Sequence, residues 1–190
     1  MRAASPGDEL TKPGQQCREP VWGRADDMRT VTPIQATDEA IVPFPPTDVW
    51  RVLAAVAAYP SWWPSYLGLR VLHSEAGLVG SEVEQRPFGG RPFRCRVEAV
   101  EEPSSIRTQY HGGFIEGRGE WRLEPMGSGT RVCYELDVHA EGRVVAWLGQ
   151  ILPLGRMHSR QMQRVFRQLE RVLMEGKAPS PSGKREGKAL

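Results

Sequence analysis

Histidines and tyrosines are the residues of this chain that could carry out acid–base chemistry. The four histidines are His73, His111, His139 and His158. Their spacing matches no metal-binding motif, so the sequence predicts neither a metal site nor a cofactor. His158 lies on the packed face of a helical pattern, where it could form a catalytic pair with Tyr110 or Tyr134. General acid–base catalysis requires a group within hydrogen-bond reach of the substrate, so these three residues are the candidates for catalysis.

Other residues could bind an apolar molecule through a few polar contacts. The side chains expected to point inward from strands are unusually polar and aromatic for a solid core: Gln85, Thr108, Tyr110, Trp121 and Tyr134. Apolar pockets usually orient their ligand with a few such groups. The alternative, for any one of them, is that a backbone group or a buried water satisfies it. Gly117 and Gly119 are also expected to face inward, which indicates a bend, a bulge or space for a ligand.

Aromatic residues gather in the stretch from Tyr59 to Tyr66, which reads YPSWWPSY. Tyrosine and tryptophan suit the rim of a cavity because each combines an apolar ring with one polar group. The alternative is that these rings only pack short helices against the sheet. With the later helix included, the predicted ligand-binding residues are Trp63, Tyr66, Gln85, Tyr110, Gly119, Trp121, Tyr134, Ile151, His158 and Met162.

A long C-terminal helix over residues 143–174 is predicted to hold one side of this site. Its second half is amphipathic, because residues at three- and four-residue spacing fall on one helical face. That face carries His158, Met162, Val165, Phe166, Leu169, Val172 and Leu173, and the opposite face carries Arg156, Arg160, Arg164, Arg167 and Arg171. An arginine face of this kind is usually solvated, and the alternative is contact with an anionic membrane or an acidic partner.

The first half of that helix is apolar around more than half of its circumference, over residues 144–152. Pro153 separates the two halves, because proline removes a helical N–H and bends the helix. We expect the apolar half to line the mouth of a cavity and to move when a ligand enters, or to contact a membrane or a second subunit. Simple burial beneath the aromatic stretch is the alternative.

The rest of the folded region reads as strands that end at glycines and prolines. Residues 34–44 form the first strand, and two short helices follow, the first beginning near Pro45. Six more strands are predicted over residues 69–75, 80–88, 92–101, 105–114, 115–125 and 129–139. Their short connections favour antiparallel neighbours. The predicted fold class is α+β, a curved seven-stranded antiparallel sheet wrapped round the long C-terminal helix.

Two parts of the chain resemble the START-like (SRPBCC) superfamily, and in particular its polyketide cyclase/dehydrase and lipid-transport branch. The first is IVPFPPTDVW at 41–50 with YPSWWP at 59–64, and the second is GEWRLEP at 119–125 with GSGTRV at 127–132. The resemblance covers about residues 34–174. It implies a helix-grip fold with an elongated apolar cavity between sheet and helix. The Tyr-Pro turn is also similar to that of coenzyme Q-binding relatives, which adds a quinone to the expected ligands.

Composition and charge indicate the number of domains, the kind of partner and the location of the protein. The chain has 190 residues, enough for one domain, and its net charge of +2 gives no support for nucleic-acid binding. It has no apolar run as long as a membrane span and no secretory signal at its start, so we expect a cytoplasmic protein. We expect a disordered leader over residues 1–29, a domain over 30–175 and a flexible basic tail over 176–190, with Met28 as an alternative start.

The first functional hypothesis is a carrier or sensor that binds a lipid, an isoprenoid or quinone, or a polyketide-like molecule in an internal cavity. The second is a cyclase or dehydratase type of enzyme that uses the same cavity without a metal. The third is a protein-interaction module that acts through the long helix. The first is favoured because binding needs only volume and a few hydrogen bonds, whereas catalysis needs two converging titratable groups. Peripheral membrane contact and homodimerisation are further hypotheses, and no nucleic-acid partner is expected.

Overall fold

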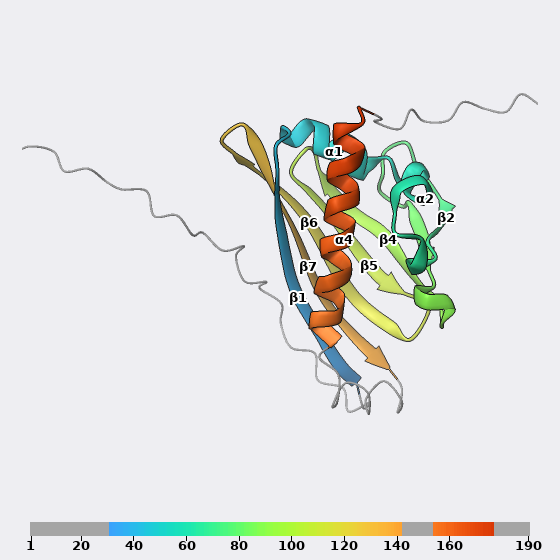
Figure 1. The fold of residues 1–190 in the computed structure, drawn as a ribbon. Coiled ribbons are helices and arrows are strands. Elements are labelled where there is room, and N and C mark those ends of the chain that lie inside the picture. Colours follow the sequence, from blue (N-terminus) through green and yellow to red (C-terminus); the bar gives the residue numbers. More distant parts are fainter. Residues whose placement is uncertain (1–30, 142–153, 177–190) are drawn as a thin grey trace, which may run out of the picture.

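The computed structural model of the protein describes residues 31–141 and 154–176 (Figure 1). Its main feature is a seven-stranded antiparallel sheet in the order β1-β7-β6-β5-β4-β3-β2. The strands are β1 (Val31–Val42), β2 (Arg70–His73), β3 (Glu82–Gln85), β4 (Phe93–Glu101), β5 (Ser105–His111), β6 (Ile115–Met126) and β7 (Gly129–Glu141). β1 and β2 form the two edges, so the sheet is open. The predicted helix-grip fold is confirmed.

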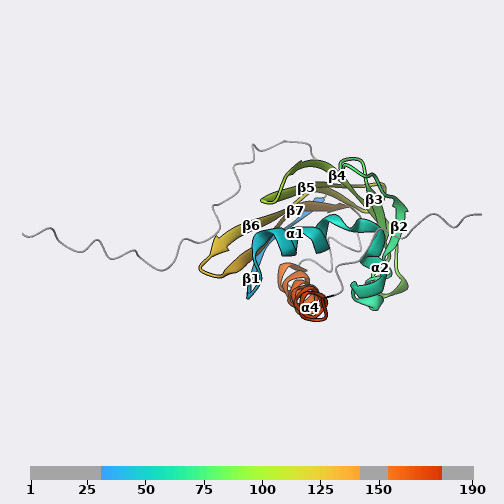
Figure 2. The same cartoon turned by 90° about the horizontal axis from the view of Figure 1, so that it is seen from above.

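The helices cover the concave face of this sheet. Those that follow β1 are α1 (Pro46–Ala54), η1 (Val56–Ala58), α2 (Tyr59–Trp62) and η2 (Ser65–Leu67); η3 (Pro87–Gly89) joins β3 to β4, and α4 (Leu154–Met174) comes last. α4 lies along the concave face against β1 and α1, while α2 lies near β2 (Figures 1 and 2). The predicted apolar segment 144–152, with Ile151, and the bend at Pro153 lie outside the described residues.

The local sequence explains the first helix. Pro46 is its first residue, where the missing N–H costs no hydrogen bond and the fixed φ suits a helix. Asp48 in the first turn forms an ion pair with Arg51 one turn later. Val49, Val52 and Leu53 are fully or almost fully buried. α1 therefore closes one end of the sheet with the apolar stripe that its sequence predicts.

The sequence of β7 alternates, and five residues at alternate positions are buried on its inner face: Thr130, Val132, Tyr134, Leu136 and Val138. The outer face is not uniformly exposed. Glu135 has only 6% of its surface exposed, and its carboxylate forms an ion pair with Arg122 of β6. A buried carboxylate needs such a partner to offset its lost hydration. At this position the outer face is therefore covered rather than solvated.

The strand predicted over residues 80–88 is too long. The observed strand β3 ends at Gln85, and η3 follows. Phe88 and Gly89 in this turn have φ angles of 53° and 71°, which belong to the left-handed region rather than to a strand. Glycine adopts such angles freely, whereas phenylalanine does so rarely. The chain reverses here toward β4.

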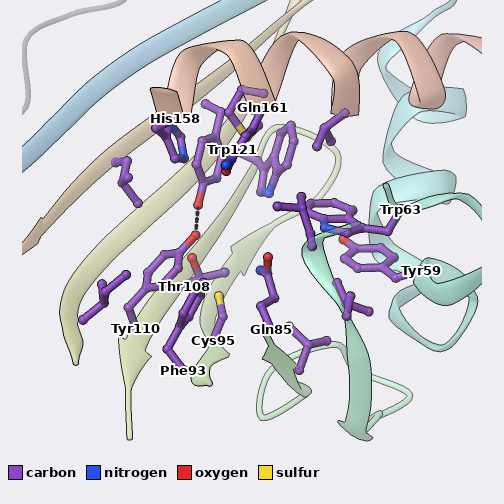
Figure 3. Close-up of a pocket in the computed structure, with 18 of the residues that line it drawn as sticks. Tyr59, Trp63, Gln85, Phe93, Cys95, Thr108, Tyr110, Trp121, His158 and Gln161 are labelled. Carbon is purple, nitrogen blue, oxygen red and sulfur yellow. Dashed lines mark hydrogen bonds between the residues drawn. The ribbon is translucent and has the colours of Figure 1, made fainter. Parts of the chain in front are cut away.

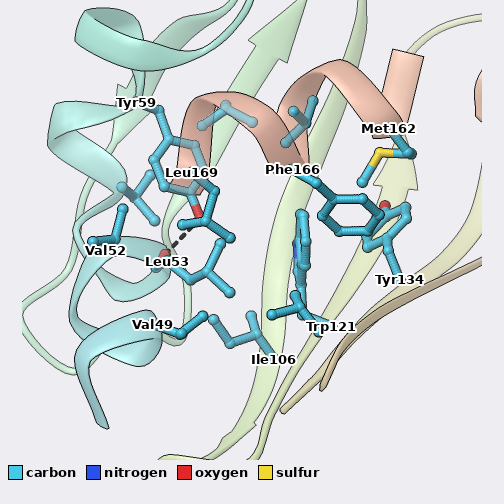
Figure 4. Packing of buried hydrophobic residues seen from close by; sticks show 14 of the residues in the cluster. Val49, Val52, Leu53, Tyr59, Ile106, Trp121, Tyr134, Met162, Phe166 and Leu169 are labelled. Carbon is cyan, nitrogen blue, oxygen red and sulfur yellow. Dashed lines mark hydrogen bonds between the residues drawn. The ribbon is translucent and has the colours of Figure 1, made fainter. Parts of the chain in front are cut away.

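The core lies between α4, α1 and the inner face of the sheet (Figure 4). Val165 and Leu169 of α4 are fully buried, and Phe166 meets the Trp121 ring edge-to-face with their centroids 6.0 Å apart. Aromatic pairs at this separation contribute beyond the area they bury. The core therefore fixes α4 on the sheet at its C-terminal half. Its N-terminal half faces a cavity.

Candidate ligand-binding cavity

A cavity of about 340 Å³ lies between the inner face of the sheet, the N-terminal half of α4 and the α1–η2 region (Figure 3). This volume falls within the range of small-molecule sites. Most of its wall is apolar, with valine, leucine and isoleucine from six strands. Trp63 closes one side and stacks on Tyr59, with ring centroids 5.3 Å apart. An apolar molecule is the natural occupant of such a space.

The structure places seven of the ten predicted ligand-binding residues on the wall of this cavity. They are Trp63, Gln85, Tyr110, Trp121, Tyr134, His158 and Met162. Ile151 lies outside the described residues. Tyr66 and Gly119 are not part of the wall. A contact between any of these residues and a ligand stays a prediction.

Tyr66 faces away from the cavity, toward the surface of the protein. Its ring stacks on Phe88 with centroids 5.4 Å apart, and the Arg164 guanidinium lies 5.3 Å from its centre. The prediction that this ring contacts a cavity ligand is therefore not supported by its position. The reason is the η2 turn, whose single helical turn directs Leu67 inward and Tyr66 outward.

Gly119 faces inward as predicted, but the space beside it is already filled. A Cβ atom at this position would meet the Tyr134 hydroxyl, the Thr108 hydroxyl and the edge of the Tyr110 ring. The glycine therefore leaves room for protein side chains rather than for a ligand. Gly117 differs, because a Cβ there would meet the backbone of β7 at Asp137, and its φ is +141°.

The hydroxyl groups of Tyr110 and Tyr134 form a hydrogen bond with each other inside the wall (Figure 3). Burial is the main reason why the pKa of each hydroxyl lies well above its usual value. For Tyr110, the neighbouring Tyr134 and Cys95 raise the pKa further. Both tyrosines are therefore neutral near pH 7. They can donate or accept a hydrogen bond, but they do not act as bases there.

The partner of His158 differs from the prediction. Its ring stacks on the Tyr134 ring, with centroids 5.8 Å apart and planes 24° from parallel, so the two do not form a hydrogen-bonded pair. Instead, its Nδ1 atom lies 3.4 Å from the Oδ2 atom of Asp38. Asp38 is a β1 residue with 6% of its surface exposed. Neither the Nδ1 atom nor the Oδ2 atom has a hydrogen-bond partner among the described residues, so the contact is a close approach of carboxylate and ring.

Several polar groups of the wall have no protein partner. The Nε1–H of Trp63 is buried without a hydrogen bond, and the Gln85 amide forms none within the described part of the chain. Figure 3 shows the Gln85 amide directed toward the space between Trp121 and Trp63. By contrast, the Thr108 hydroxyl donates to the Gly119 carbonyl at 3.0 Å. The Gln85 amide, as an unpaired donor in an apolar cavity, is suited to an acceptor oxygen of a ligand.

The model of the family described as polyketide cyclase/dehydrase and lipid transport matches residues 33–173. The chain belongs to this family. Among curated proteins, it is 24% identical over 120 residues to the persistence and stress-resistance toxin PasT of Escherichia coli O6:H1, a match that covers 62% of this chain and 75% of PasT. The ribosome association toxin RatA of Escherichia coli K12 matches with the same identity and coverage.

Solved structures support the same fold. TTHA0849 from Thermus thermophilus superposes with a TM-score of 0.64 at 18% identity, covering 75% of this chain and 98% of that protein. A point mutant of norcoclaurine synthase from Thalictrum flavum gives a TM-score of 0.59 at 14% identity, covering 77% of this chain and 98% of the synthase. Both are similar in fold to this family member.

Asp38 is a buried residue beside the site that sequence reasoning missed: it contacts His158 of the cavity wall but does not line the cavity itself. The signal was present, because Ile34, Ala36, Asp38, Ala40 and Val42 alternate along β1 and share its inner face. β7 shows the same kind of alternation, with its inner face buried. Of the Asp38–His158 pair, His158 lines the cavity, whereas Asp38 lies behind it.

No helix in the described ranges is long and apolar enough to cross a membrane. The five arginines predicted on one face of α4 are all exposed. The third hypothesis, an interaction through the long helix, also relied on residues 144–152, which lie outside the described residues.

Proposed function

We propose that the protein binds a hydrophobic small molecule with at least one acceptor oxygen and acts as its carrier or sensor. A lipid, an isoprenoid or quinone, and a polyketide-like compound all have this chemistry. The main support is a cavity of about 340 Å³ whose wall is apolar except for a few groups, among which Trp63 and Gln85 lack protein partners. Membership of a polyketide cyclase/dehydrase and lipid-transport family agrees with this proposal.

Native mass spectrometry of the purified protein tests the proposal directly. A bound compound should appear as an additional mass that is released when the protein is denatured. An apolar extract of the denatured protein should then contain a compound with a carbonyl, hydroxyl or similar oxygen. A protein that is consistently empty and that also takes up no apolar fluorescent probe would contradict the proposal.

Val83 offers a specific test of where the molecule binds. This β3 residue is buried and lines the cavity, so Val83→Phe should place its larger ring in empty space rather than in packed core. We expect the affinity for anilinonaphthalene sulfonate to fall by roughly tenfold or more, with a change in unfolding free energy below about 1.5 kcal/mol. Fluorescence titration and urea unfolding measure the two effects. Val83→Ile, which adds one methylene group, is the matched control and should bind nearly normally.

Catalysis in the same cavity is the second candidate function, and the contact between Asp38 and His158 favours it. A histidine on the wall of the cavity, close to a carboxylate, is suited to remove a proton from a carbon next to a carbonyl group. The neutral hydroxyl pair of Tyr110 and Tyr134 could donate a hydrogen bond to that carbonyl oxygen. This is chemistry of the cyclase or dehydratase type, and it needs no metal.

Deuterium exchange distinguishes catalysis from binding alone. The compound that co-purifies is incubated with the protein in deuterium oxide and then weighed by mass spectrometry. If His158 is a general base, the natural protein should introduce deuterium, whereas His158→Gln should bind the compound and introduce roughly a hundredfold less. Asp38→Asn, which removes the charge beside His158, should also reduce exchange. Equal exchange in all three proteins, or no exchange in any, would leave binding as the function.

A further inference from the structure

Phe88 is an exposed aromatic residue whose conformation is unusual. It lies at the tip of the η3 turn with 70% of its surface exposed and a φ of 53°. Both the left-handed backbone and the exposed ring are unfavourable for a phenylalanine. The turn is nevertheless well formed, because the Gly89 N–H donates to the Arg86 carbonyl at 3.1 Å and the Gly90 N–H donates to the Pro87 carbonyl at 2.9 Å. The ring is therefore held out into solvent by a fixed turn.

Arginines lie near the aromatic pair that this ring forms with Tyr66. Phe88 stacks on Tyr66, and Arg164 of α4 lies over the other ring of that pair. Arg86 precedes the turn, and neither it nor Arg164 has a carboxylate partner within the part of the chain that the structure describes. Arg70 nearby differs, since Glu84 pairs with it at 3.3 Å. We call Tyr66, Phe88, Arg86 and Arg164 the aromatic–arginine face.

The aromatic–arginine face borders the cavity. Pro87 of the same turn lines the cavity, and so does Gln161, which lies three residues before Arg164 on α4. Met157, one turn earlier, lines the cavity and is also 40% exposed, so the cavity wall reaches the surface there. Apolar side chains at the surface and unpaired arginines thus surround one end of an apolar cavity.

We propose that the aromatic–arginine face docks on an anionic lipid bilayer, with the Phe88 ring inserted among the lipids and the arginines at the headgroups. The combination of one apolar tip with nearby positive charge fits a bilayer surface, because the interface offers apolar and anionic partners side by side. An acidic protein or an RNA would complement the arginines but would not explain the adjacent apolar cavity. This inference goes beyond ligand binding, since the protein could bind a ligand without contacting a membrane.

Vesicle sedimentation with the full chain tests the proposal. The vesicles contain phosphatidylcholine alone or equal parts of phosphatidylcholine and phosphatidylserine. We expect the protein to sediment with the second kind and to be released by added salt, because salt screens charges at a surface. Arg164→Gln should weaken binding by about fivefold, and Phe88→Gly by about tenfold.

The Phe88→Gly variant separates a docking role from a structural one. Glycine suits the left-handed conformation, so its thermal midpoint should stay equal or rise while its vesicle binding falls. Met126→Ala and Arg107→Gln are matched controls, since they change an exposed apolar residue and an exposed arginine away from the η3 turn. Both should bind vesicles normally.

Two results would overturn the proposal. One is that Phe88→Gly and Arg164→Gln bind the anionic vesicles as tightly as the natural chain. The other is that these variants lose binding to a single-stranded RNA or an acidic polypeptide while vesicle binding is unchanged, which would assign the face to that partner. Uptake of anilinonaphthalene sulfonate is measured in parallel. A variant that takes up the probe normally but no longer binds vesicles would show that the docking face can be lost without loss of ligand binding in the cavity.

Discussion

Gly119→Leu is expected to destabilise the protein by about 3–5 kcal/mol, a large part of the stability of a typical domain. The leucine Cβ would collide with the Tyr134 hydroxyl, and the Thr108 hydroxyl and Tyr110 ring lie immediately beside it. Overpacking of this kind costs roughly 1–3 kcal/mol. Separating the two tyrosine hydroxyls leaves a buried polar group unpaired, which adds roughly 1–3 kcal/mol. Urea unfolding followed by circular dichroism measures the loss.

A double-mutant cycle shows whether the tyrosine hydroxyl is the cause. Gly119→Ala introduces only the colliding Cβ, and Tyr134→Phe removes the oxygen nearest to it. The double variant should therefore be less destabilised than the sum of the two single variants. Gly77→Ala is the control, because nothing lies within 4 Å of a Cβ at that position. Additive effects at positions 119 and 134 would show that the space beside Gly119 is open, as a ligand site would require.

Periodicity predicted most of the fold, since it depends on short-range pattern. The inner face of β7 follows strict alternation, and the buried face of α4 follows three- and four-residue spacing, so both could be assigned without coordinates. The C-terminal end of β3 could not be assigned from the sequence in this way. Whether the chain stays extended or turns at Phe88 depends on a left-handed conformation that phenylalanine does not favour.

The site was less predictable, because a wall depends on which side chains meet across the sheet. In the register of the sheet, Gly119 lies opposite Leu136 of β7 and Thr108 of β5. The hydroxyl that occupies the space beside Gly119 nevertheless belongs to Tyr134, which lies two residues before Leu136 in β7. No spacing in the sequence indicates such a diagonal contact. The Asp38–His158 contact also joins a first strand to a last helix. The alternation of β1 predicts that Asp38 faces inward, but only the packing of α4 shows what it meets.

The protein is expected to unfold cooperatively in alkali, between about pH 9 and pH 11. Three buried tyrosines and the partly buried Cys95 have raised pKa values in the folded state, so above their usual pKa values they ionise only in the unfolded chain. Burial raises the pKa of the Cys95 thiol from 9.0 to about 11, against hydrogen bonds to Thr108 and Tyr110 that lower it. Burial also raises the pKa values of Tyr59, Tyr110 and Tyr134 well above their usual value of 10.0. Above these usual values the unfolded chain binds fewer protons than the folded one, so the unfolding free energy falls as pH rises. The contribution of these four groups to the unfolding free energy is fully present below about pH 9.

The expected size follows from linkage, which gives about 1.4 kcal/mol per group for each pH unit above its unfolded pKa. At pH 11 the thiol would account for roughly 2–3 kcal/mol and the three tyrosines together for about 4 kcal/mol, which approaches the whole stability of many domains. Urea unfolding at several pH values should show the unfolding free energy falling as pH rises. The tyrosinate absorbance of these three residues should appear together with the loss of circular dichroism, because they ionise when the chain unfolds. Cys95→Val should move the onset upward toward the tyrosine pKa of 10.0, since the thiol begins the decline. The opposite result is that Tyr59, Tyr110 and Tyr134 ionise reversibly while the protein keeps its circular dichroism. That result would show that solvent reaches these hydroxyls in the folded protein.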